Sequence, residues 1–242
     1  MNEVFFAESY RTERAKADIS MFVMCGDCAP VKHKVKHNLV IDLTQTEDEI
    51  LGGMSREHRR VIRGCIRDEA FVIERIAKPS KEELDEFVAF FNEFSQNKGI
   101  YSLDAEHFKP YIDTGRFLLT KTRDRDSNVL GYLTYFYDED RVSAQYSCSH
   151  FRMSEDPELR KQISHNTKYS HYSNMCYFKS LGLKKYDFGG LRLTPEGEPE
   201  SGVDVLKLRF GGEIVTEYCF FYPNTLLGKL ALTMRPKDPS GL

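Results

Sequence analysis

Strand-like and helix-like segments alternate along the whole of this 242-residue chain, and this alternation constrains the fold more than any other feature. Runs with the pattern of β-strands cover residues 19–24, 38–43, 71–76, 116–122, 129–138, 141–149, 185–188 and 213–222. The runs 129–138 and 141–149 are joined by so short a connection that they are expected to pair antiparallel, as a hairpin. Helical segments between most of the strands, together with a hairpin, predict an α/β fold with a mixed sheet.

Helical segments separate the strand-like runs. The first is expected over residues 46–68, where Thr46 and Glu49 have the spacing of a capping box, and the second, over 80–96, starts with the same arrangement. Weaker helical patterns cover residues 166–181, 203–210 and 224–234. The segments 152–159 and 194–201 have the composition of loops, and the second of them is expected to form a mobile flap.

The composition is that of a soluble globular protein with a core of its own. Hydrophobic residues make up 40% of the chain and charged residues 29%, which excludes a disordered or coiled chain. We expect one domain over residues 1–242, in which residues 1–45 form an N-terminal strand region packed on the rest. The apolar runs are too short to span a bilayer, and the first residues lack the features of a signal peptide. The expected location is the cytoplasm, where the six scattered cysteines would be reduced.

The first expected helix carries arginines along one side. Arg56, Arg60, Arg63 and Arg67 are spaced by four, three and four residues, which places them on one helix face. Because the net charge of the chain is -3, this stripe is a local basic surface and not part of a generally basic protein. One interpretation is a solvated face whose charges meet the acidic residues at 82–86. The other is a docking surface for a phosphorylated substrate or an RNA acceptor stem, since guanidinium groups bind phosphate oxygens well.

Paired glycines stand on either side of a short helical pattern near the C-terminus. The chain reads YDFGG at 186–190, then Gly202, Lys207 and FGGE at 210–213. Residues 54–74 read MSREHRRVIRGCIRDEAFVIE. The strand-like segment HNLVIDLT precedes them at 37–44, and residues 45–53 lie between the two segments. These segments resemble parts of the FemABX-type transferases, a branch of the GNAT acyltransferase superfamily.

The resemblance implies a GNAT-like fold and an amide-forming acyltransferase. The fold would have a mixed, mostly antiparallel central sheet flanked by helices and splayed between two central strands to admit the donor. The enzyme would move an acyl or aminoacyl group to the amine of a small-molecule acceptor, such as an amino sugar or a nucleotide-linked sugar, phosphorylated or not.

No permanently bound cofactor is implied, because the donor is a cosubstrate. Fem-type enzymes use aminoacyl-tRNA, whereas many GNAT enzymes use acyl-CoA and hold its pyrophosphate with an RxxGxG or RxxGxA loop. Residues 150–166 contain no glycine, which weakens the expectation of acyl-CoA and leaves aminoacyl-tRNA, acyl-CoA and acyl carrier protein as the donors to test.

Amide formation needs a stabilised oxyanion and a path for a proton, and the sequence offers groups for both. Lys207 matches the lysine of the family's FK-type motif, with Leu206 in place of the usual Phe, and would stabilise the oxyanion. Tyr146 and His150 are expected on one face of a strand, because side chains alternate along it, and would carry the proton. Asp187 is expected to cap the adjoining turn, the alternative being a contact with the acceptor amine. The remaining candidate substrate-binding residues are Arg56, Arg60, Arg63, His171, Gly189, Gly190, Arg209 and Gly211.

A pair of cysteines precedes a pair of histidines in the N-terminal region. Cys25, Cys28, His33 and His37 superficially resemble a set of zinc ligands. The residues between the two cysteines are a turn signal at the end of an apolar strand, and a second CxxC pair does not follow. We therefore expect a hairpin over residues 25–37, with neither a bound metal nor a thioredoxin-like redox site.

A non-catalytic function is the alternative to the enzyme. An RNA-binding or interaction protein would use the arginine-rich helix face and its exposed tyrosines. A lysine at 207 beside paired glycines favours the enzyme, whereas salt-sensitive binding to RNA as the sole affinity would favour the alternative. The sequence itself names neither the donor nor the acceptor.

Overall fold

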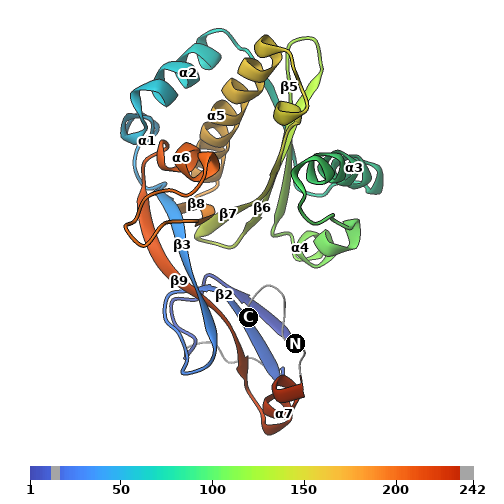
Figure 1. The fold of residues 1–242 in the computed structure, drawn as a ribbon, viewed down its shortest axis with the longest axis vertical. Coiled ribbons are helices and arrows are strands. Elements are labelled where there is room, and N and C mark those ends of the chain that lie inside the picture. Colours follow the sequence, from blue (N-terminus) through green and yellow to red (C-terminus); the bar gives the residue numbers. More distant parts are fainter. Residues whose placement is uncertain (12–16, 235–242) are drawn as a thin grey trace. The chain divides into compact units, whose positions relative to one another are not determined.

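The computed structural model describes residues 1–11 and 17–234 (Figure 1). The chain divides into two compact units. The first unit comprises residues 1–39, 190–204 and 213–242, and the second comprises residues 40–189 and 205–212. Each unit is therefore assembled from segments that are distant in the sequence.

The second unit is built on a mixed sheet. Its strands are β3 (His33–Asp42), β4 (Val72–Ile76), β5 (Phe117–Arg123), β6 (Val129–Tyr137), β7 (Arg141–Cys148) and β8 (Lys185–Leu191), of which β3 and β8 contribute only in part. The order is β3-β8-β7-β6-β5-β4. Strands β4 to β7 pair antiparallel in succession, and β7 pairs with β8 in parallel. The predicted mixed sheet and the predicted hairpin of β6 and β7 are confirmed.

Helices cover both faces of this sheet. They are α1 (Glu47–Gly53), α2 (Arg56–Arg67), α3 (Lys81–Lys98), α4 (Lys109–Asp113), α5 (Pro157–Ser180) and the second half of α6 (Gly202–Leu208), with the 3-10 turns η1 (Ala105–Phe108) and η2 (His150–Arg152). In Figure 1, α2 and α5 lie on one side of the sheet and α3 and α4 on the other. Helix α5 packs on β6 and α2, α3 packs on β7, and α4 packs on β5. Since both faces are covered, β5 and β6 are buried along most of their length.

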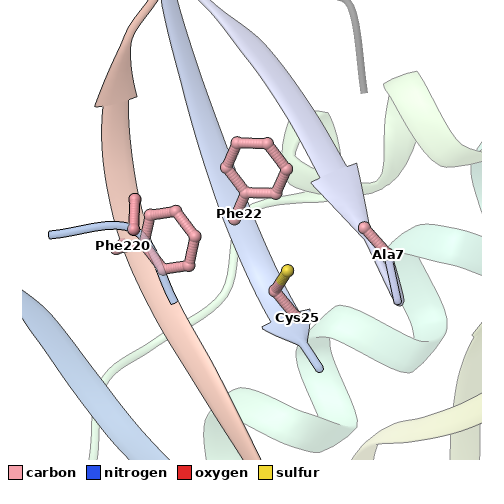
Figure 2. Close-up of a cluster of buried hydrophobic side chains, with 5 residues drawn as sticks. Ala7, Phe22, Cys25 and Phe220 are labelled. Carbon is pink, nitrogen blue, oxygen red and sulfur yellow. The ribbon is translucent and has the colours of Figure 1, made fainter. Parts of the chain in front are cut away.

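The first unit contains β1 (Asn2–Phe5), β2 (Ile19–Cys25), β9 (Glu213–Pro223) and the first part of β3, in the order β1-β2-β9-β3, with α7 (Leu226–Met234) packed on β9. Figure 2 shows its core, in which Ala7, Phe22, Cys25 and Phe220 are buried together. The rings of Phe22 and Phe220 stack with centroids 5.0 Å apart. This cluster holds β2 against β9.

The expected hairpin over residues 25–37 is wrong, because β9 lies between β2 and β3. Strands β2 and β3 are thus both neighbours of β9, which lies almost two hundred residues further along the chain. A turn signal between two apolar runs shows that the chain changes direction, but it does not show which strand pairs with which.

The expected helix over 46–68 is two helices. Helix α1 ends at Gly53, and Met54 has an extended conformation with φ −75° and ψ 161°. Ser55 then caps α2 by accepting the backbone N–H of His58. Both predicted capping boxes, at Thr46 and at the start of α3, are present.

The helix expected over residues 166–181 corresponds to α5. It starts nine residues earlier than expected, at Pro157, with Asp156 as its N-cap. Its first turns are polar, so they lack the apolar periodicity by which a helix is recognised in sequence. Strand β1, the turn η1 and the short helix α4 were not predicted. Among the helices that the structure describes, none has the length and apolarity required to cross a membrane.

Candidate functional site

Strands β7 and β8 part within the second unit. Residues 141–143 pair in parallel with residues 185–187, and the described pairing ends there although β7 continues to Cys148. Gly189, further along β8, has a φ of +74°, a conformation that glycine adopts without strain. The sheet is therefore splayed between two central strands.

A buried ion pair joins the two strands just before they part. Arg141 Nη2 donates to Asp187 Oδ2 at 2.7 Å, and both side chains are buried. Asp187 Oδ1 accepts the backbone N–H of Gly189 at 2.7 Å. The carboxylate of Asp187 therefore caps the adjoining turn, as the sequence predicts, and is at the same time held by an arginine.

Tyr146 and His150 both lie on the sheet face that α3 covers, but they do not share a strand. Strand β7 ends at Cys148 and His150 belongs to η2, so the alternation on which the prediction rested does not extend to His150. The hydroxyl of Tyr146 lies 3.0 Å from Nε2 of the exposed His107, and burial raises the pKa of Tyr146. The His150 ring stacks on Phe90 at 4.0 Å.

Lys207 and His171 lie on the opposite side of the sheet, where α5 packs. Lys207 is half-buried on α6, and its charge acts on His171, which is buried on α5. The Nδ1 atom of His171 lies 2.7 Å from the hydroxyl of Tyr186 on β8. Burial first, and then the charge of Lys207, lowers the pKa of His171 to about 3. The imidazole of His171 is therefore neutral at physiological pH.

A second buried histidine, His58 on α2, lies near the same residues. Its ring packs edge-on against Phe210 at 4.7 Å, and its Nδ1 lies 3.2 Å from the hydroxyl of Ser55. Burial lowers the pKa of His58 to about 4, and the nearby charge of Lys168 acts in the same direction. Two neutral histidines thus lie among lysines in this part of the second unit.

Arg209 is bound to α2. It donates from Nη1 to Glu57 Oε2 at 2.9 Å, and Glu57 also lies 3.5 Å from the buried Lys168. Gly211 has a φ of +77°, and a Cβ there would lie 2.5 Å from the carbonyl oxygen of Gly53. Contacts with α2 and α1 therefore explain why an arginine stands at position 209 and a glycine at position 211, without a role in binding a ligand.

The arginine face of α2 is exposed to solvent. Arg56, Arg60 and Arg63 are exposed, and within the part of the chain that the structure describes they make no ion pair or hydrogen bond. The expectation that these charges meet the acidic start of α3 is wrong, because α2 and α3 lie on opposite faces of the sheet (Figure 1). Glu86, from that acidic segment, instead binds Lys121 at 2.6 Å.

A pocket of about 570 Å³ lies beside this face, and Arg60 contributes to its wall. Its apolar floor includes Val61 and Phe71, which belong to one buried cluster. Charged groups of both signs surround the floor: Arg60, Arg125 and Lys161 with Asp68, Asp124, Asp126 and Glu158. The pocket can hold a group that carries both an apolar part and a charge.

The predicted residues do not form one cluster. The structure brings Lys207 and His171 together on one face of the sheet and Tyr146 and His150 on the other, while Gly190 belongs to the first unit. In that first unit Cys28 Sγ lies 3.7 Å from His33 Nδ1. Cys28 packs against the apolar cluster that contains Cys25, and His37 lies beside Thr216. Among the described residues, three or more His, Cys, Asp or Glu side chains are nowhere grouped so that they could hold a metal ion.

Sequence reasoning missed His58, His107 and Lys168. A signal for His58 is present: it continues the apolar stripe of Val61, Ile62 and Cys65 at helical spacing, so its burial follows from the pattern. His107 has no such signal, because it comes near Tyr146 only through the packing of η1 on the sheet.

The fold of this chain is similar to that of several solved structures, three of which are 13–15% identical to it. The crystal structure of FemX superposes with a TM-score of 0.61 at 14% identity, over 82% of this chain and 63% of FemX. The structure of L-PGS from Bacillus licheniformis gives a TM-score of 0.56 at 13% identity, over 89% of this chain and 71% of that chain.

A third structure is the C-terminal domain (DUF2156) of a putative lysylphosphatidylglycerol synthetase from Agrobacterium fabrum. It gives a TM-score of 0.57 at 15% identity, over 89% of this chain and 70% of that chain. The chain thus spans less than two thirds of FemX. No protein-family model matches the chain, and a search of curated proteins found no match to its sequence. The predicted GNAT-like fold is confirmed.

Proposed function

We propose that this chain transfers an acyl or aminoacyl group from an activated donor to an amine and so forms an amide. The observation that carries the proposal is the parting of β7 and β8 in a GNAT-like sheet, with Lys207 held on the face that α5 covers. The names of the similar structures support it, since a lysylphosphatidylglycerol synthetase handles a lysyl group. A fold hosts many activities, so the proposal depends on the residues at the parting.

The reaction is an attack of a neutral amine on an activated carbonyl. The nitrogen lone pair forms the new N–C bond while the C=O π electrons move to oxygen. Collapse of this tetrahedral intermediate restores the C=O bond and breaks the bond to the leaving oxygen or sulfur. The proton lost by the amine ends on that leaving group, so the products are an amide and a free hydroxyl or thiol.

Lys207 is proposed to stabilise the tetrahedral oxyanion. Its ammonium must be charged for this task, and its half-buried position would strengthen the interaction relative to water. Tyr146 packs on the opposite face of the sheet, against Phe91 of α3, so the proton of the amine is proposed to reach the leaving oxygen or sulfur through bound water.

The exposed guanidinium groups of α2 are proposed to hold the phosphate of a substrate. Arg56, Arg60 and Arg63 have no anionic partner among the described residues, and Arg60 opens onto the pocket of about 570 Å³. This surface suits aminoacyl-tRNA, acyl-CoA or acyl carrier protein as donor, or a phosphorylated sugar amine as acceptor.

The donor class is the first thing to test. The purified chain is mixed with acyl-CoA thioesters, acyl carrier protein and charged tRNA, and binding is measured by native mass spectrometry and by the shift of the melting temperature. A donor that binds is then incubated with amino sugars and nucleotide-linked amino sugars, and amide formation is followed by mass spectrometry. Binding of one donor followed by an amide product is the expected result.

Non-catalytic RNA binding is the second candidate, and the unpaired arginines of α2 favour it. In that case charged and uncharged RNA bind equally, binding weakens steeply with salt, and no amide forms with any acceptor. The same panel therefore separates the two functions.

A further inference from the structure

Five side chains form a continuous chain of hydrogen bonds within the second unit. Arg75 Nε donates to Asn174 Oδ1 at 2.9 Å, and Asn174 Nδ2 donates to the hydroxyl of Tyr135 at 3.0 Å. That hydroxyl lies 2.9 Å from the hydroxyl of Tyr186, which lies 2.7 Å from Nδ1 of His171. The chain connects β4, α5, β6 and β8 and ends beside the charge of Lys207.

The direction of every hydrogen bond in this chain follows from its first member. Arginine has donors and no acceptor, so the amide oxygen of Asn174 must face Arg75. The NH₂ group of Asn174 must then face Tyr135. The oxygen of Tyr135 then accepts, and its hydrogen goes to the oxygen of Tyr186. The hydrogen of Tyr186 in turn goes to Nδ1 of His171.

The opposite direction would leave a buried donor without a partner. If His171 carried its hydrogen on Nδ1, Tyr186 would accept from His171 and donate to Tyr135. Tyr135 would then accept from both Asn174 and Tyr186, and its own hydrogen would have no acceptor. Tyr135, Tyr186 and Asn174 are completely buried, so water does not replace the missing acceptor, and buried hydroxyls in proteins are seldom left in that state.

We propose that this chain fixes His171 as the neutral tautomer with its hydrogen on Nε2, so that His171 acts beside Lys207 as a hydrogen-bond donor and not as a general base. Among the described residues the Tyr186 hydroxyl is the one hydrogen-bond partner of His171, and the rings of Phe188 and Phe210 pack against it. Besides Tyr186, the titratable groups that act on it among the described residues are Lys207 and the neutral His58. The assignment of the tautomer stands on geometry alone, whereas its catalytic meaning rests on the proposed function.

A donor at this position complements Lys207. Two cationic or N–H groups on one side of the reacting carbonyl both favour negative charge on its oxygen. A basic lone pair there would instead compete for a proton of the Lys207 ammonium. His171 is thus proposed as a second donor to the reacting oxygen, beside Lys207.

The tautomer is measured directly by ¹⁵N NMR of the full chain with labelled histidine. The expected wild-type spectrum shows His171 protonated on Nε2 and unprotonated on Nδ1 between pH 5 and 8, without titration. Protonation on Nδ1, or titration within this range, would overturn the proposal.

An isosteric substitution should reverse the chain. In Asn174→Asp one carboxylate oxygen still accepts from Arg75, while the other accepts from Tyr135 in place of donating to it. Every later bond then changes direction, and His171 should move its hydrogen to Nδ1. Asn166→Asp is the matched control: Asn166 is buried on the same helix and its Oδ1 accepts from Ser170 at 2.9 Å. The control should keep the wild-type tautomer, and an Asn174→Asp spectrum like that of the control would refute the proposed direction.

Tyr186→Phe covers the case in which Asn174→Asp does not fold. It removes the donor to Nδ1, so a fraction of His171 should appear with its hydrogen on Nδ1. Tyr137→Phe, on the same face of β6 but without a described hydrogen bond at its hydroxyl, should leave the tautomer unchanged. An unaltered His171 spectrum in Tyr186→Phe would also refute the proposal.

Activity tests the catalytic meaning separately from the tautomer. Glutamine places an N–H near the position of Nε2, whereas asparagine places it near Nδ1. His171→Gln should keep a rate at least about tenfold higher than His171→Asn, since losing one preorganised donor costs on the order of 10²-fold in kcat. Equal rates would refute the donor role even if the NMR result holds, and absence of transfer by the wild type would refute the proposed function but not the tautomer.

Discussion

Arg141 and Asp187 form a buried ion pair across β7 and β8, within the short parallel segment that precedes the parting of the two strands. The guanidinium Nη2 lies 2.7 Å from the carboxylate Oδ2, and the two side chains are 8% and 0% exposed. In the strand register Asp187 lies opposite Ser143, where the parallel pairing ends. The ion pair therefore closes the paired segment on the side from which the strands diverge.

Asp187→Asn should destabilise the fold strongly. It leaves the buried guanidinium of Arg141 facing a neutral amide, and removing one partner of a buried ion pair costs about 3 to 5 kcal/mol. Urea unfolding followed by circular dichroism measures the change. The control is Asp140→Asn, which removes an exposed ion pair with Lys184 and should change the free energy of unfolding by less than about 1 kcal/mol. Equal losses in the two variants would show that the buried pair has no special role.

Lys207→Met should lower the rate of transfer while leaving donor binding nearly unchanged. Methionine keeps the length and the apolar part of the side chain but removes the charge, and losing one oxyanion-stabilising group reduces kcat on the order of 10² to 10³-fold. Single-turnover kinetics with the donor identified by the binding panel measures the effect. Lys185→Met, an exposed lysine at the start of β8, is the control. A Lys207→Met rate close to the wild-type rate would make this lysine a structural residue.

Substituting Arg60 and Arg63 by Gln should raise KM or weaken binding of the phosphate-bearing substrate more than it lowers the melting temperature. Both side chains are exposed and lack an anionic partner among the described residues, so the fold loses little. Arg67→Gln is the control, since Arg67 lies on the same helix but is paired with Asp68 at 2.7 Å. A lower melting temperature with unchanged binding would assign the face to folding.

The free energy of unfolding should fall between pH 7 and pH 5. Burial lowers the pKa of His58 to about 4 and that of His171 to about 3 in the folded state, while the unfolded chain takes up protons near pH 6.5. Stability is therefore lost as the pH falls through 6.5, by about 2 kcal/mol per histidine at pH 5. Carboxylates with lowered pKa act only at lower pH and do not disturb this range.

Urea unfolding at several pH values tests the assignment of this loss. His58→Gln and His171→Gln should each remove about one proton from the pH dependence of stability. If the double variant lost as much stability as the wild type between pH 7 and pH 5, other groups would be responsible.

The purified chain should contain no stoichiometric metal. Transfer from an ester or thioester does not require one, and within the described part of the chain three or more His, Cys, Asp or Glu side chains are nowhere grouped so that they could hold a metal ion. Elemental analysis of protein prepared without a metal-affinity tag measures the content. One zinc per chain, lost together with the fold in a variant carrying Cys25→Ser and Cys28→Ser, would show that the prediction is wrong.

Local sequence signals predicted most of the elements of the fold. The capping residues Thr46 and Ser80 mark the starts of α1 and α3, because a cap acts within one helical turn. The partners of β2 were not predictable in this way. Its pairing with β9 joins residues such as Ile19 and Pro223, and no local pattern records a contact over that sequence separation.

Site residues were predicted less completely than elements. Lys207 and Asp187 were found through the resemblance to the FemABX-type transferases, because their surrounding segments are continuous in sequence. The partner of Asp187 was not found: Arg141 is 46 residues away and is read from sequence only as the first residue of a strand. Ion pairs of this kind arise from strand register, which the residues of one strand do not determine.

The close contact of Gly211 with Gly53 makes a mechanical link between two surfaces of the second unit. The backbone N–H of Ser55 donates to the carbonyl of Arg209 at 2.8 Å, and the Arg209 side chain holds Glu57. The start of α2 and the end of α1 are thereby joined through backbone contacts to the short segment that follows Lys207. Because a Cβ at position 211 would lie 2.5 Å from the carbonyl oxygen of Gly53, any residue larger than glycine there would push the segment that follows Lys207 away from α1.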